Sequence, residues 1–231
     1  MQNSHNKLKN RTGCITIHFA SLFCNSPSLR RTRRQMGGIM KVLLLLAKGF
    51  ETMEFSVFID IIGWARNDFN CNITVHTCGF TKQVISTFLV PVTVDKLLEE
   101  IHTEDYDALA IPGGFEEFGF YEEAYDERFL QIIREFHEQN KPIASVCVAA
   151  LALGKSGILT GKRATTYHLG NGRRQNQLRE FGAIVINEPV VTDEKITTSY
   201  CPQTAPFVAF QLLEQLAGKE LTDTVRIAMG F

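Results

Sequence analysis

Residues 142–150 constrain the fold of this 231-residue chain more than any other segment. A short apolar run, Pro142–Val146, passes directly into small apolar residues that suit the start of a helix, and Cys147 lies at the junction. So abrupt a strand-to-helix turn projects the side chain at its apex beyond the carboxyl edge of a sheet, as in the nucleophile elbow of hydrolases. The sequence therefore predicts that Cys147 occupies such an elbow, with a positive or otherwise strained φ.

The same position gives the thiol of Cys147 a distinctive electrostatic environment. Free N–H groups and the macrodipole at a helix N-terminus favour a thiolate, so we expect the pKa of this thiol to be lowered. The alternative is a buried structural cysteine that packs as a small hydrophobic residue, which is the commoner fate of a free cysteine.

Two further strand ends supply groups that suit a reactive thiol. The apolar run 41–47 is followed by a helix whose first turn contains Glu54. Another apolar run, 107–112, ends in Gly113-Gly114, whose N–H groups are not shielded by a Cβ atom. Because parallel strands present their carboxyl ends at one edge of a sheet, we expect a carboxyl group, a thiol and a donor loop to meet there.

Strand and helix patterns alternate along the chain, which is typical of a parallel sheet covered by helices on both faces. On the helix expected at 51–67, the spacing of Phe55, Phe58, Ile59, Ile62 and Ala65 predicts one buried face. Further helices are expected at 126–139, 148–156, 174–181 and 204–216, and strands at 41–47, 72–78, 82–88, 90–94, 107–112, 142–146, 163–167, 184–191 and 195–200. The predicted fold class is therefore α/β.

Four segments, in this order, resemble the ThiJ/PfpI family, the cysteine-containing branch of the class I glutamine-amidotransferase-like superfamily. The matching residues are 47–54 (AKGFETME), 112–114 (PGG), 143–147 (IASVC) and 198–205 (TSYCPQTA). The resemblance extends over residues 39–218 and is closest to the Parkinsonism-associated deglycase branch. It implies a flavodoxin-like three-layer sandwich with a mostly parallel sheet, and a homodimer.

The resemblance also implies roles for individual residues. Cys147 is the expected nucleophile of the elbow, and Glu54 is the carboxyl group that hydrogen-bonds to it. The amides of Gly114 and Val148 are the expected oxyanion hole. Val148 directly follows the cysteine at the position where peptidase-type members carry a histidine, which argues against a protease.

The sequence departs from the family at the expected histidine. Hydrolytic and glyoxalase-type members usually carry a histidine after a Thr-Thr or similar pair near the cysteine. Here Tyr167 follows the pair, and His168 comes one position later. Neighbouring side chains of an extended segment point to opposite faces, so we expect Tyr167 to face Cys147 and His168 to face away.

Three more positions leave alternatives open. Phe88 stands where the deglycase branch carries an arginine. Phe115 can wall an apolar pocket beside the glycine loop, or it can pack as an ordinary cap between loop and helix. Cys201 can resolve an oxidised Cys147, or it can be an inert loop cysteine.

Charge separates the first part of the chain from the rest. Residues 1–40 contain seven Lys/Arg and no Asp/Glu, whereas residues 41–231 contain 17 Lys/Arg and 25 Asp/Glu. We therefore expect a basic leader, residues 1–38, followed by a ThiJ/PfpI-like domain, residues 39–231. The leader can be a targeting segment, or a disordered stretch upstream of a true start at Met36 or Met40.

Composition disfavours several function classes. No apolar run approaches the roughly 20 residues that span a bilayer, and the basic cluster 30–34 lacks the interleaved aromatic residues of a nucleic-acid surface. The six cysteines show neither a disulfide framework nor a zinc-binding spacing. We therefore expect a cytoplasmic protein without a metal or cofactor, and without a membrane or nucleic acid as partner.

Two functions fit these features. The first is a cysteine-dependent enzyme of the glyoxalase III or deglycase type, in which Cys147 adds to a small electrophilic carbonyl compound. The alternative is a non-enzymatic oxidation sensor or stress-protective protein, in which Cys147 becomes a sulfinate held by protonated Glu54. An in-line histidine would favour the enzyme, and its absence keeps both hypotheses open.

Overall fold

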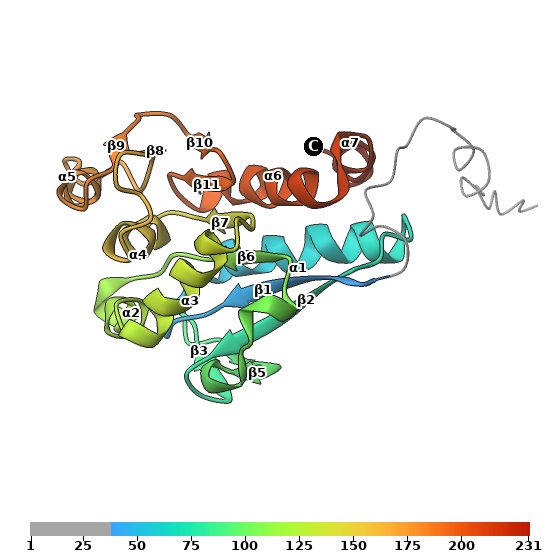
Figure 1. Cartoon of the computed structure of the whole chain (residues 1–231), viewed down its shortest axis with the longest axis horizontal. Helices are drawn as coiled ribbons and strands as arrows, with labels where there is room; N and C mark the ends of the chain where they lie inside the picture. The colour runs from blue at the N-terminus through green and yellow to red at the C-terminus, as the bar shows by residue number, and fades with distance from the viewer. Residues whose placement is uncertain (1–37) are drawn as a thin grey trace, which may run out of the picture. The chain divides into compact units, whose positions relative to one another are not determined.

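A computed structural model describes residues 38–231, of which residues 39–231 form one compact unit (Figure 1). The predicted leader therefore lies, apart from Gly38, outside the described residues. The centre of the unit is a seven-stranded sheet in the order β10-β11-β7-β6-β1-β2-β5. Its strands are β1 (Met40–Leu45), β2 (Ile73–Gly79), β5 (Lys96–Leu97), β6 (Ala108–Ile111), β7 (Ile143–Ser145), β10 (Val190–Asp193) and β11 (Ile196–Ser199).

All neighbours in this sheet run parallel except β10, which pairs antiparallel with β11 at one edge. The helices are α1 (Thr52–Asn67), α2 (Phe120–Ala124), α3 (Glu127–Glu138), α4 (Ala149–Lys155), α5 (Arg173–Glu180), α6 (Ala205–Ala217) and α7 (Lys219–Ala228). Helices α1, α6 and α7 contact one another, and a second series of contacts joins α2 to α3, α3 to α4 and α4 to α5 (Figure 1). The predicted α/β class with a mostly parallel sheet is confirmed.

Strand β1 lies at the heart of the core because it is apolar on both faces. It pairs with β2 on one side and β6 on the other. The side chains of Val42, Leu43, Leu44 and Leu45 are completely buried. A strand that is covered by helices on both faces has a continuous run of apolar residues rather than an alternating pattern. Residues 42–46 form such a run.

Helix α1 buries a slightly different face from the one expected. Phe58, Ile62 and Ala65 are buried as predicted, together with Ile61, but Ile59 is more than one-third exposed. Each residue advances about 100° around a helix, so Ile59 lies just beyond the face centred on the others. The first buried side chain of this face is Glu54, a carboxylate in an otherwise apolar row.

Several predicted strands are shorter in the structure, and the one expected at 184–191 is interrupted, with β10 beginning at Val190. The strand expected at 163–167 is only β8 (Arg163–Ala164), which pairs with the two-residue β9 (Ile184–Val185). The hairpin expected at 82–94 consists of β3 (Gln83–Ile85) and β4 (Pro91–Thr93), joined by a loop in which Leu89 has a φ of 63°. Helices α2 and α7 and the short β5 had no counterpart among the expected elements.

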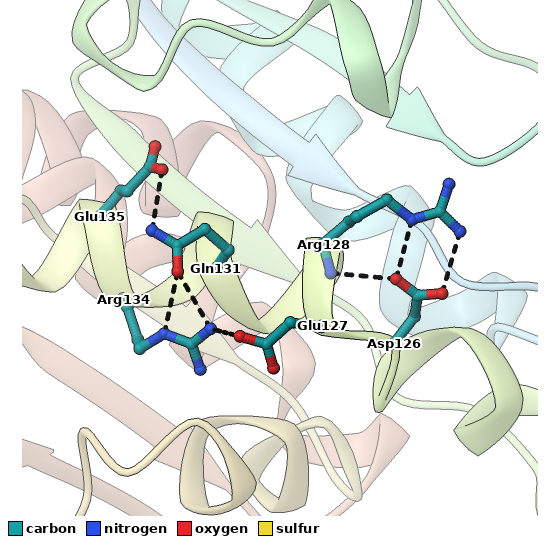
Figure 2. A network of polar contacts seen from close by, with 6 residues as sticks. All are labelled: Asp126, Glu127, Arg128, Gln131, Arg134 and Glu135. Carbon is teal, nitrogen blue, oxygen red and sulfur yellow. Dashed lines mark hydrogen bonds and ion pairs between the residues drawn. The ribbon is translucent and has the colours of Figure 1, made fainter.

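Helix α3 matches its prediction and carries a polar network on its exposed side (Figure 2). The carboxylate of Asp126 caps the helix by accepting from the Arg128 amide at 2.9 Å, and the same carboxylate binds the Arg128 guanidinium. Along the helix, Arg134 contacts both Gln131 and Glu127. Ion pairs this exposed contribute little free energy, so the apolar side of α3 holds it against the sheet.

Candidate active site

The chain forms the predicted elbow between β7 and α4. Cys147 has a φ of 57°, in the left-handed region that non-glycine residues rarely adopt. Both of its backbone groups are bound: its amide donates to the carbonyl of Ser199 at 3.0 Å, and its carbonyl accepts from Oγ1 of Thr166 at 2.8 Å. These bonds stabilise a backbone conformation that costs on the order of 1–3 kcal/mol. The predicted positive φ at Cys147 is confirmed.

Glu54 reaches the elbow from the first turn of α1. Its Oε2 accepts a hydrogen bond of 2.7 Å from the Gly113 amide, and the side chain is almost completely buried. Its Oε1 has no N–H or O–H partner within the described part of the chain, and the carboxyl group interacts with the Cys147 thiol.

Glycine at position 113 makes this arrangement possible. A Cβ atom on Gly113 would lie 2.8 Å from Oε2 of Glu54, 2.9 Å from the Val146 carbonyl oxygen and 3.0 Å from Cβ of Cys147. The three segments that carry the acid, the thiol and the donor loop therefore meet where no side chain fits. Sequence reasoning identified Gly113-Gly114 as donors but did not identify this packing role.

Burial controls the acid–base properties of the pair. It raises the pKa of Glu54 to about 8, against the opposing hydrogen bond from Gly113. Burial also raises the pKa of the Cys147 thiol, and the charge of Glu54 raises it further, while the Val148 amide opposes both effects. The expected lowering of the thiol pKa is therefore wrong, because desolvation and a neighbouring acid outweigh a single turn of helix amides.

The raised pKa of Glu54 changes what the carboxyl group offers the sulfur. Below pH about 8, Glu54 is protonated, so it carries no charge that would repel a thiolate. A protonated carboxyl group also donates a hydrogen bond, which a carboxylate cannot do. At neutral pH the site therefore contains a proton donor next to the Cys147 thiol.

The donor loop is fixed by backbone pairing. Gly114 forms an isolated antiparallel bridge with Phe50. Two backbone hydrogen bonds flank this bridge. The Glu51 amide donates to the Gly113 carbonyl at 2.8 Å, and the Phe115 amide donates to the Gly49 carbonyl at 3.1 Å. In this type of pair the N–H of Gly114 points away from Phe50. Across the site, the Val148 amide faces the Cys147 sulfur. The role of both amides in an oxyanion hole stays a prediction.

Comparison with known proteins assigns the chain to a family. Residues 40–215 match the model of the DJ-1/PfpI family. The chain belongs to the DJ-1/PfpI family. It is 32% identical over 189 residues to Protein DJ-1alpha of Drosophila melanogaster, covering 81% of this chain and 82% of that protein.

Other members of the DJ-1/PfpI family are similar over most of the described residues. The Glutathione-independent glyoxalase DJ-1 of Schizosaccharomyces pombe is 29% identical over 193 residues, covering 81% of this chain and 96% of that protein. The crystal structure of Drosophila melanogaster DJ-1beta has a TM-score of 0.73 and 26% identity, covering 83% of this chain and 98% of the other. With Protein DJ-1 homolog B of Arabidopsis thaliana the match is 28% identical and covers 79% of this chain but only 39% of that longer protein.

The segment that carries the family's histidine is irregular in this chain. Tyr167 and His168 are half-buried and follow β8 outside any strand, so the alternation used to orient them does not apply. The His168 ring stacks on the Tyr200 ring with centroids 3.9 Å apart. Its Nδ1 is buried without a hydrogen-bond partner among residues 38–231. The hydroxyl of Tyr200 donates to Asn187 at 2.8 Å, so His168 rests on a fixed ring.

Two exposed aromatic rings lie near each other, one after the donor loop and one on the β3–β4 loop. Phe115 and Phe88 are both largely exposed, and their ring centroids lie 6.2 Å apart. Phe115 also precedes a short 3-10 helix, Glu116–Phe118, as its N-cap residue, so it lies between loop and helix with an exposed ring.

A buried arginine beside the glycine loop was not foreseen. Arg174 from α5 lies over the ring of Tyr121 at 4.9 Å and pairs with the Glu116 carboxylate at 2.7 Å. Only 14% of the Arg174 side chain is exposed, whereas its neighbour Arg173, which also pairs with Glu116, is 62% exposed. The Tyr121 hydroxyl is buried without a partner in the described part of the chain.

Other expectations concern metals and membranes. Among residues 38–231, no group of three or more His, Cys, Asp or Glu side chains is placed to hold a metal ion. No helix in the same range is both long enough and apolar enough to cross a membrane.

Proposed function

We propose that this DJ-1/PfpI protein is a cysteine-dependent enzyme that acts on small electrophilic carbonyl compounds, as glyoxalase III and deglycase enzymes do. The observation that carries the proposal is the Glu54 carboxyl group, held by Gly113 at 2.7 Å and kept next to the Cys147 thiol. The name of the Schizosaccharomyces pombe relative, a glutathione-independent glyoxalase, supports the substrate class.

Each residue has a defined task in the first step. The Cys147 sulfur attacks the carbonyl carbon, so that a C–S bond forms while the C=O π electrons move to oxygen. The amides of Gly114 and Val148 bind the developing oxyanion. Glu54 gives its proton to that oxygen and recovers one from the thiol, which leaves a neutral hemithioacetal. Glu54 then moves a proton from C1 to C2 as the adduct rearranges to a thioester, and water cleaves the thioester C–S bond to release the hydroxy acid and restore the Cys147 thiol.

Two features support the proposal that the site binds small, reactive molecules and uses Glu54 as its one acid–base group. The exposed rings of Phe88 and Phe115 offer an apolar surface near the donor loop, and Glu54 and the Val148 amide both act on the Cys147 thiol. A single acid with a pKa of about 8 is partly protonated and partly ionised near neutral pH, as a proton shuttle requires.

A second function is favoured by the same pKa. Protonated Glu54 can donate a hydrogen bond to a Cys147 sulfinate, which stabilises that oxidation state. The protein would then act as a non-enzymatic oxidation sensor or protective protein. This alternative predicts no catalytic turnover of carbonyl compounds.

We further propose that the protein is a cytoplasmic homodimer. Exposed apolar side chains gather on the hairpin loop and the start of α1, and they include Met53, Phe88 and Leu89. A second copy would cover them. Light scattering coupled to size-exclusion chromatography tests this assembly.

Turnover of methylglyoxal tests the enzymatic proposal. The full chain is incubated with methylglyoxal, and the hydroxy acid product is measured for the wild type, for Cys147→Ser and for Cys71→Ser as a matched control. We expect multiple turnovers in the wild type and in Cys71→Ser, and none in Cys147→Ser. Product below one equivalent per wild-type chain, together with a stable Cys147 sulfinate after peroxide treatment, would support the sensor instead.

A further inference from the structure

Cys201 is a second thiol beside the elbow, and the proposed carbonyl chemistry does not use it. It follows β11 in the loop before α6, with a half-buried side chain and a fully extended backbone (φ −168°, ψ 177°). Cys147 and Cys201 are both free thiols.

Strand register places the two cysteines close together. Strands β7 and β11 are parallel neighbours in which Ser145 lies opposite Thr198. The Cys147 amide donates to the Ser199 carbonyl at 3.0 Å, so the pairing continues beyond the ends of both strands. Continued register puts Tyr200 opposite Cys147, and Cys201 is the next residue.

The resulting separation suits a disulfide. Adjacent strands lie about 4.8 Å apart and each residue advances about 3.3 Å, so a diagonal neighbour lies at about 6 Å between α-carbons. Disulfides form over α-carbon separations of about 4.4–6.8 Å. Cys201 also exerts an electrostatic effect on the Cys147 thiol, which agrees with the proximity inferred from the strand register.

The other described cysteines are unsuited to this role. Cys78 is completely buried in β2, and burial raises its pKa to about 12. Cys71 lies in the turn between α1 and β2, where its amide binds the Ala65 carbonyl at 3.0 Å. Among the described cysteines other than Cys147, only Cys201 follows the strand next to the elbow.

We propose that Cys147 and Cys201 form a reversible intramolecular disulfide when the protein reacts with a hydroperoxide. The Cys147 thiolate first attacks a peroxide oxygen: an S–O bond forms, the O–O bond breaks, and the peroxide is reduced to water or an alcohol as the sulfur becomes a sulfenic acid. The Cys201 sulfur then attacks the Cys147 sulfur. An S–S bond forms, the S–O bond breaks, and hydroxide leaves with the Cys201 proton as water.

The disulfide would have two effects on the site. It removes the nucleophile from carbonyl chemistry, and it diverts the sulfenic acid from further oxidation to a sulfinate. A dithiol reductant restores both thiols by exchange. The inference uses the same thiol as the proposed function, but its readout is a covalent mass change, so either proposal can fail while the other holds.

Peptide mapping under non-reducing conditions tests the disulfide directly. The full chain is treated with one equivalent of hydrogen peroxide, remaining thiols are alkylated, and the protein is digested with trypsin. Cys147 and Cys201 fall in separate peptides, residues 135–155 and 196–219, each with one cysteine. We expect these peptides to be cross-linked in the wild type and in Cys71→Ser, and to separate after dithiothreitol treatment.

Cys201→Ser supplies the decisive comparison. In this variant we expect no cross-link and a larger yield of Cys147 sulfinate than in the wild type at the same peroxide dose. Equal sulfinate yields with no cross-linked peptide in the wild type would overturn the proposal. A cross-link from Cys147 to Cys14 or Cys24 in place of Cys201 would overturn it as well. Circular dichroism confirms that Cys201→Ser is folded.

Discussion

The Gly113 amide donates a hydrogen bond of 2.7 Å to Oε2 of Glu54, which ties the loop after β6 to the first turn of α1. The bond orients a buried acid toward the sulfur at the elbow. It also explains why a carboxyl group is tolerated in the buried face of α1, since an unpaired polar group there would be costly. The predictions below follow from this contact and from the groups around it.

Gly113→Ala should disable the site. The new Cβ would lie within 3.0 Å of Glu54, Val146 and Cys147 atoms, so the carboxyl group must move away from the sulfur. We expect loss of methylglyoxal turnover and a stability loss of about 1–3 kcal/mol from overpacking. Gly63→Ala is the control, because nothing lies within 4 Å of its Cβ and alanine favours the helix interior. Unchanged turnover in Gly113→Ala would show that the Glu54 position is unimportant.

Glu54→Gln should change how the reactivity of Cys147 depends on pH. Above pH about 8, wild-type Glu54 is charged and suppresses the thiolate, whereas glutamine is neutral at all pH values. Removing that charge lowers the pKa of the Cys147 thiol and so increases its thiolate fraction at alkaline pH. We expect iodoacetamide to alkylate Cys147 faster in Glu54→Gln than in the wild type at pH 9, as measured by mass spectrometry. Rate–pH profiles that coincide for the two proteins would contradict the coupling.

The same carboxyl group should make stability depend on pH. Its pKa is raised in the folded state from 4.5 to about 8, so the folded protein binds more protons than the unfolded chain between these values. The stability contribution is full below pH about 4.5 and is lost as pH rises toward 8, with a limiting slope of about 1.4 kcal/mol per pH unit. Urea denaturation should show this loss in the wild type and in the exposed control Glu117→Gln, but not in Glu54→Gln. The prediction fails if Glu54→Gln loses stability as steeply as the wild type.

His168→Ala should retain catalysis. The imidazole stacks on Tyr200 and its Nδ1 has no hydrogen-bond partner among residues 38–231, whereas Glu54 and the Val148 amide act on the Cys147 thiol. Loss of a general base typically lowers rates by about 10²–10⁴-fold, so we expect a decrease of less than about tenfold in methylglyoxal turnover. Tyr200→Phe keeps the stacked ring and serves as the control. Abolished turnover in a folded His168→Ala protein would identify the imidazole as the base and would exclude the sensor.

Arg174→Ala should destabilise the protein more than Arg173→Ala does. Arg174 is mostly buried against Tyr121 and pairs with Glu116, so its removal loses a cation–π contact, packing and an ion pair, about 1–2 kcal/mol together. Arg173 is well exposed, and its loss should cost less than about 0.5 kcal/mol. Urea denaturation of the two variants measures the difference. Equal effects would show that Arg174 does not hold the loop.

The elbow and the donor loop could be predicted because both are local. The apolar strand that ends at Cys147 determines the local backbone geometry of the elbow, and the Gly113-Gly114 pair determines that of the donor loop. The structure has a positive φ at Cys147, as expected. The thiol pKa was predicted in the wrong direction, since desolvation depends on side chains packed from other segments. Tyr167 was predicted to lie on a strand, but β8 ends three residues before it. This strand is short because it pairs only with the two residues of β9.

The bridge between Phe50 and Gly114 has a consequence for how the site can diversify. The Gly49 amide binds the Ile85 carbonyl and the Thr87 amide binds the Phe50 carbonyl, both at 2.8 Å, so this bridge also anchors the β3–β4 hairpin. Backbone hydrogen bonds therefore hold the loops that carry Phe88 and Phe115. Such bonds do not depend on which side chains the loops carry. Under the carbonyl chemistry proposed above, point substitutions at positions such as Phe88 and Phe115 would alter substrate range without displacing Cys147, so specificity could evolve on a frame that stays fixed.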